Sequence, residues 1–115
     1  MSDDRGSATI WAVSAIAALV TLTVVVLALG AAVSTRHRAE AAADLAALAV
    51  ASHALDGIEA ACARAHVVTD GMGAELVRCE LDGWDAVVEV DVSGPTALSG
   101  LGFGHGRARA GPVPP

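Results

Sequence analysis

The sequence contains no tyrosine. It also contains no lysine, so its cationic side chains are arginines and histidines alone. Without lysine, the alternating glycines of Gly100–Gly106 lack the cation of a phosphate-binding loop, and they neither follow a predicted strand nor open a helix. Acidic residues outnumber arginines, giving a net charge of -6. An acidic chain gains nothing by releasing the counterions of a phosphate backbone. Nucleic acid is therefore not expected as a partner.

Cysteine is also scarce, with Cys62 and Cys79 as the only two. Neither has a second cysteine or a histidine beside it at the spacing of zinc ligands, so no metal site is predicted. On the outer side of a membrane the two thiols would form one disulfide. Closing that loop of about 17 residues would stabilise the fold by roughly 3 kcal/mol. In the cytoplasm the same residues would be a pair of buried free thiols.

Residues arranged for catalysis are absent as well. His37, His53, His66 and His105 are scattered, and no Ser/His/Asp set or pair of carboxylates has a supporting context. His53 and Asp56 stand about one helical turn apart, which a solvated polar face explains better than a catalytic pair. We therefore predict no catalytic residues and no cofactor, and we do not expect an enzyme.

Charge is missing altogether from Gly6 to Thr35. As a helix this run is roughly 44 Å long, which exceeds the ~30 Å hydrocarbon core of a bilayer. It predicts a short leader at 1–6 and a transmembrane helix at 7–35. The competing interpretation is a secretory signal cleaved near Gly30, although the apolar run is about twice the usual length of roughly 7–15 residues.

Strong helix formers continue beyond the apolar run, without glycine or proline from Ala39 to Ala51. They predict an extramembrane helix at 36–66, continuous with the span from about Ser7 to Ala65 and stopped by Asp70-Gly71. Apolar residues recur along it at a spacing of about 3.5 residues. This candidate association stripe consists of Ala41, Leu45, Leu48 and Leu55.

The chemistry then changes to that of strands. Residues 74–81 and 85–92 flank Asp82-Gly83, a dipeptide favoured in tight hairpin turns. Alternation of valine with acidic residues in the second strand predicts one buried and one solvated face. We expect a β-hairpin region at 67–93 and a flexible Gly/Pro-rich tail at 94–115, within which 107–112 could add a third strand. The predicted fold class is a membrane α+β protein: a long N-terminal transmembrane helix continuing into an extracytoplasmic amphipathic helix, capped by a small antiparallel hairpin or three-stranded sheet.

Two segments, Asp4–Ile10 and Arg38–Ala49, resemble the TadE/TadG-like proteins of Tad (Flp) pilus-assembly and secretion systems, which are pilin-like. The resemblance implies cleavage by a prepilin peptidase between Gly6 and Ser7, a cytoplasmic N-terminus and an extracytoplasmic C-terminal domain. At the fifth position after that cut, where pilins usually carry glutamate, this chain has Trp11. We interpret Trp11 as an aromatic anchor at the membrane interface.

The resemblance also implies the partners: the membrane, other Tad or pilin-like subunits, their assembly machinery and the peptidase. The predicted function is accordingly that of a pilin-like membrane component of a Tad/Flp pilus-assembly or related secretion system, acting by helix–helix association. The alternative is a small secreted binding protein, released by signal-peptide cleavage near Gly30.

Overall fold

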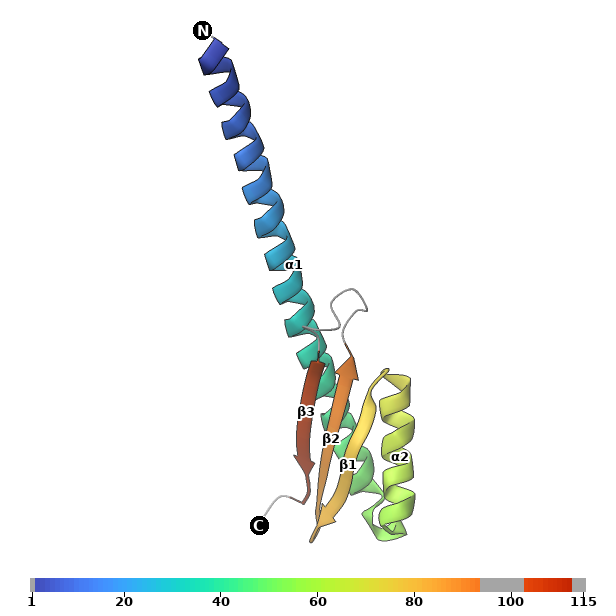
Figure 1. Ribbon diagram of the computed structural model, residues 1–115. Coiled ribbons are helices and arrows are strands. Elements are labelled where there is room, and N and C mark those ends of the chain that lie inside the picture. Colours follow the sequence, from blue (N-terminus) through green and yellow to red (C-terminus); the bar gives the residue numbers. More distant parts are fainter. Residues whose placement is uncertain (1, 94–102, 113–115) are drawn as a thin grey trace. The chain divides into compact units, whose positions relative to one another are not determined.

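The computed structural model describes residues 2–93 and 103–112, which form three helical segments and one sheet (Figure 1). In chain order the elements are α1 (Ser2–Ser52), the 3-10 turn η1 (Ala54–Asp56), α2 (Ile58–Gly71), β1 (Glu75–Asp82), β2 (Asp85–Ser93) and β3 (Phe103–Ala110). The chain divides into two compact units, Met1–Gly30 and Ala31–Pro115. The predicted α+β class with a three-stranded antiparallel sheet is confirmed.

The first unit contains only the N-terminal part of α1. From Ile10 to Leu29 its large apolar side chains are all exposed, and by length and composition this is one helix that could span a membrane. Thr21 and Thr23 donate their hydroxyls to the carbonyls of Ala17 and Leu19, each 2.8 Å away and one turn earlier. These bonds remove the cost of a free hydroxyl on an apolar helix.

The prediction of one continuous helix to Ala65 is wrong, because α1 ends at Ser52. Ser52 Oγ donates back to the Ala49 carbonyl at 3.0 Å, and η1 follows. Gly57, with a φ of 98°, then adopts a backbone conformation that other residues rarely tolerate and lets the chain reverse into α2. Asp70-Gly71 does mark the end of α2, where the Ala74 N–H donates to the Thr69 carbonyl at 2.8 Å.

The hairpin of β1 and β2 forms around the predicted turn. Asp82 pairs with Asp85, and Gly83 takes a φ of 65° in the two-residue loop between them. A bulge at Val77 interrupts the ladder between Leu76 and Arg78. The bulge places Leu76 and Cys79 on the same face of the sheet, which strict alternation from Leu76 would not allow.

The C-terminal segment 94–115 was predicted to be a flexible tail in which 107–112 could add a short third strand. Within it the structure describes residues 103–112, which include the longer strand β3, and the rest of the predicted tail lies outside the described residues. This strand pairs antiparallel with β2 from Phe103 opposite Ser93 to Ala110 opposite Ala86, so the sheet order is β1-β2-β3. Glycine lowers the strand propensity of this segment. The glycines are nevertheless required here, because they bring β3 against α1.

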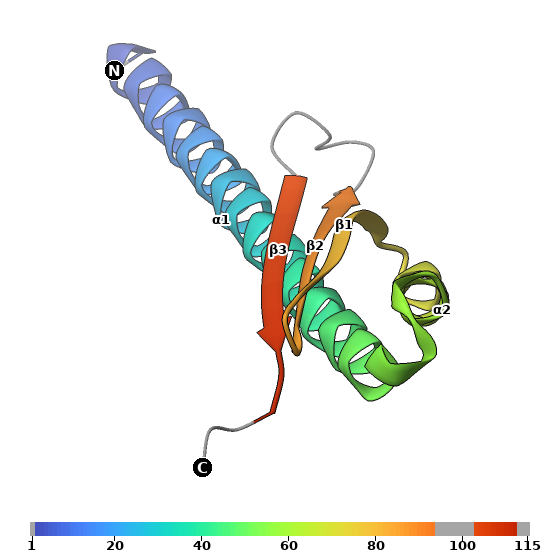
Figure 2. The same ribbon diagram turned by 90° about the horizontal axis from the view of Figure 1, so that it is seen from below.

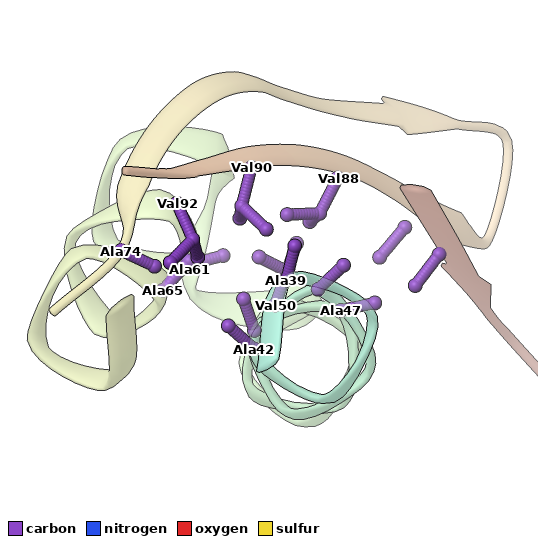
Figure 3. Packing of buried hydrophobic residues seen from close by; sticks show 14 residues of the cluster. Ala39, Ala42, Ala47, Val50, Ala61, Ala65, Ala74, Val88, Val90 and Val92 are labelled. Atoms are coloured by element: carbon purple, nitrogen blue, oxygen red, sulfur yellow. The ribbon is translucent and has the colours of Figure 1, made fainter. Parts of the chain in front are cut away.

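The core lies between one face of the sheet and the two helices (Figure 3). Figure 2 shows the link between α1 and α2 at one end of this second unit. The sheet contributes the predicted buried face of β2: Ala86, Val88, Val90 and Val92. From α1 come Ala39, Ala42, Ala43, Ala46, Ala47 and Val50, and from α2 come Ala61 and Ala65. Nearly all the helical contributions are alanines, so the sheet packs close to the helix backbone.

The closest approach is made by β3. A Cβ built on Gly104 would lie 2.5 Å from the carbonyl oxygen of Thr35, and one on Gly106 would overlap the carbonyl of Ala39. Ala108, two residues further along, is buried on the same face. Small residues at every second position of β3 therefore set the distance between the sheet and α1.

Candidate functional site: the exposed face of α1

The buried alanines of α1 face the sheet, and Leu45 and Leu48 face away from it. Leu45 is 49% exposed and Leu48 is 58% exposed, while Ala46 and Ala47 between them are buried. At 100° per residue, Ala41, Leu45 and Leu48 fall on one side of the helix. Leu55 does not belong to this side, because it lies in η1 and is 87% exposed there. The structure thus keeps three of the four predicted stripe residues together.

This arrangement follows from the close contact with β3. A leucine in place of Ala39 would occupy the space where the β3 backbone meets the helix, and the buried positions that follow on this side of α1 are alanines and Val50. The larger side chains remain outside and create an apolar strip on a charged domain. Such exposed apolar surface is typical of contact with a partner.

Cys62 and Cys79 form a disulfide, with their Cα atoms 6.1 Å apart. The bridge joins α2 to β1, and no free cysteine is present. Both residues are half-buried. The predicted pairing is therefore present, and its role is to hold α2 on the edge of the sheet.

The outer face of the sheet carries a ladder of charge pairs that the sequence analysis missed. The pairs are His105–Asp91 (2.6 Å), Arg107–Glu89 (3.7 Å), and Arg109 with Asp85 and Asp82 (2.8 and 3.1 Å). Hydrogen bonds from Arg109 to Asp85 and then to Asp82 raise the pKa of its guanidinium. Exposed pairs of this kind add little stability. They do favour one register, because slipping by one residue would move the charges to the core face.

The residues that the structure describes contain no cluster of metal-binding side chains. Across 2–93 and 103–112, no three His, Cys, Asp or Glu side chains gather closely enough to hold a metal ion. His53 Nδ1 lies 3.0 Å from the Ala49 carbonyl and 3.1 Å from Ser52 Oγ, so its contacts are made within the end of α1. Asp56 is exposed in η1.

The predicted processing site lies near the start of α1. Gly6 and Ser7 are exposed and helical, and a Cβ on Gly6 would meet nothing within 4 Å. Trp11 follows one turn later, also exposed. No steric constraint from residues 2–93 or 103–112 therefore explains the glycine.

These features define a class of protein: a small disulfide-bonded α+β domain built on a long apolar helix whose own domain leaves its leucines uncovered. Residues 6–53 match the family model described as "Putative Flp pilus-assembly TadE/G-like". Residues 6–53 are thus a TadE/G-like region, as the resemblance indicated, and α1 is the element that carries the match.

A relative from Mycobacterium tuberculosis (strain ATCC 25618 / H37Rv), named Apoptosis inhibitor Rv3654c, is 49% identical over 57 residues. The aligned region covers 50% of this chain and 61% of that protein. No solved structure matches the chain significantly.

Proposed function

We propose that this chain is a membrane-anchored, pilin-like component of a Tad/Flp pilus-assembly or related secretion system, and that it works by helix–helix association. The observation that carries the proposal is the exposed leucine side of α1. Ala41, Leu45 and Leu48 face away from the core of their own domain, on the helix that matches the family. A second helix packed there would remove apolar surface from water at about 25 cal/mol per Å².

Replacing both Leu45 and Leu48 by aspartate should abolish co-purification with neighbouring Tad subunits. Two charges would lie in the interface, where each would lose hydration without a partner. The domain itself should keep its fold, because both side chains are already half exposed. Crosslinking and co-purification from native membranes measure the association, and hydrogen exchange measures the fold.

The matched control is Val67→Asp, which places a charge at a 68% exposed valine on α2. It should leave co-purification unchanged. Wild-type recovery of partners by the Leu45→Asp/Leu48→Asp variant would refute the association stripe.

The proposed orientation has the N-terminus in the cytoplasm and the C-terminal domain outside. The disulfide supports it, because such bonds persist in oxidising compartments and are rare in the cytosol. The arginines near the two ends of the apolar run do not favour either direction. Of these two observations, the disulfide alone therefore supports an extracytoplasmic C-terminal domain.

The alternative function, a small secreted binding protein, has one supporting observation. The compact second unit begins at Ala31, directly after the Gly30 cleavage position that this alternative requires. Its hydrophobic core consists of residues from Ala39 onward, and the buried Thr35 also follows Gly30, so a cut at Gly30 would leave these residues in the mature chain.

The mature N-terminus separates these possibilities. On the pilin-like proposal, mass spectrometry of the protein from native membranes should find Ser7 as the first residue and a Gly6→Leu variant should remain uncut. A mature chain that begins at Ala31 would instead establish the secreted alternative, and a chain that begins at Met1 or Ser2 would mean an uncut anchor without peptidase processing.

A further inference from the structure

The first charged residues after the apolar run surround α1. Arg36, His37 and Arg38 follow Thr35 directly, and all three are exposed. Successive helical residues are 100° apart, so the three side chains leave the helix in three different directions. Thr35 and Ala39 occupy the remaining side and are buried, because β3 lies there. We call Arg36, His37 and Arg38 the basic collar.

The charge of the domain is divided between the collar and everything beyond it. After Arg38, acidic residues outnumber arginines by more than two to one. A negatively charged surface next to the apolar run would therefore attract the collar. It would repel the acidic rest of the domain only weakly, because physiological salt screens the repulsion between charges that are more than about 8 Å apart.

Glu40 partly neutralises the positive charge of the basic collar. Arg36 donates through Nε to Glu40 Oε1 at 3.1 Å, and His37 Nδ1 lies 3.8 Å from Oε2 of the same carboxylate. The bond to Arg36 engages Nε and leaves the two terminal nitrogens, with their four N–H donors, for another acceptor. For Arg38, no hydrogen bond or ion pair occurs within the described part of the chain. Together with Glu40, the two arginines of the collar carry about one net positive charge.

We propose that the basic collar binds the headgroups of anionic phospholipids in the leaflet that faces the folded domain. Guanidinium groups bind phosphate oxygens in a planar, two-pronged geometry, and the end of the apolar run places these groups at headgroup depth. The proposal rests on the membrane anchoring proposed above. It adds anionic phospholipid headgroups as a class of ligand. It also implies that, around Thr35, β3 covers one side of α1 while the headgroups contact the other sides.

The test compares lipids retained by the full-length chain after reconstitution in equal parts phosphatidylglycerol and phosphatidylcholine. Detergent extraction and native mass spectrometry give the ratio of the two bound lipids. One net cation near an anionic surface corresponds to about five-fold enrichment of phosphatidylglycerol. Arg36→Gln/Arg38→Gln should reduce the ratio to one or below, because Glu40 then leaves a net negative charge, and Glu40→Gln should increase it because the carboxylate no longer competes.

The matched control is Arg64→Gln/Arg78→Gln, which removes the same charge from α2 and β1 and should keep the enrichment. Equal retention of both lipids by the wild type would overturn the proposal, as would full enrichment in the Arg36→Gln/Arg38→Gln variant. Extraction of the vesicles at alkaline pH identifies a different failure. A chain that washes off the membrane contradicts the anchoring itself, whereas a chain that stays but shows no enrichment contradicts only the collar.

Discussion

The Gly106→Ala substitution should separate β3 from α1 and destabilise the domain by about 2 to 3 kcal/mol. The added methyl group would overlap the carbonyl oxygen of Ala39 and come within 2.8 Å of the Glu40 nitrogen. Both are backbone atoms of a continuous helix, so no side-chain rotation relieves the overlap. This expected loss of stability is the opposite of what intrinsic strand propensity predicts, because glycine weakens a strand and alanine should strengthen it.

Amide hydrogen exchange on the full chain in detergent micelles is the suitable measurement, since the apolar part of α1 would dominate a circular dichroism signal. Protection should fall in β3 and in the facing part of β2, where Gly106 pairs with Val90. Gly71→Ala is the control: a Cβ there meets nothing within 4 Å, and alanine is the better helix former. Equal protection in the two variants would show that β3 is not seated on α1 as described.

The contact at Gly106 also shows why β3 was harder to predict than β2. In β2 the alternation of valine and acid is visible in the sequence, and the buried face was predicted correctly. In β3 the inward positions hold glycine and alanine, which suggest a turn when hydrophobicity alone is considered. The alternation of charge could have predicted β3. His105, Arg107 and Arg109 occupy every second position, as do the acidic residues of β2 that they face.

The end of α1 was missed for a related reason. Ala and Leu continue through Leu55, so composition gives no reason to stop the helix before Gly57. Reversal there allows α2 to cover the part of the sheet near β1 that α1 leaves open, and this tertiary gain overrides local helix propensity. The exposure of Leu45 and Leu48 could not be derived either, because it depends on which side of α1 meets the sheet, and β3 lies more than fifty residues further along the chain.

Removing the disulfide should have a similarly large effect, concentrated in α2. The Cys62→Ser/Cys79→Ser variant should lose about 3 kcal/mol through the greater freedom of the unfolded chain. The buried residues of α2 are Ala61, Ala65 and Thr69, whose small side chains bury little apolar area. The bridge to β1 therefore provides a large share of what holds this helix, and hydrogen exchange should show α2 losing protection before β2 does.

Chemical reduction of the wild type provides the control, because it breaks the same bond without changing the sequence. It should reproduce the loss in α2, and unchanged α2 protection in both samples would contradict a stabilising role for the bridge.

The same cysteines report the orientation of the chain. On intact cells, a membrane-impermeant thiol reagent should label them only after treatment with an impermeant reductant. If the bond forms outside, lysis is not needed for that labelling, whereas thiols that react only after lysis would place the domain in the cytoplasm.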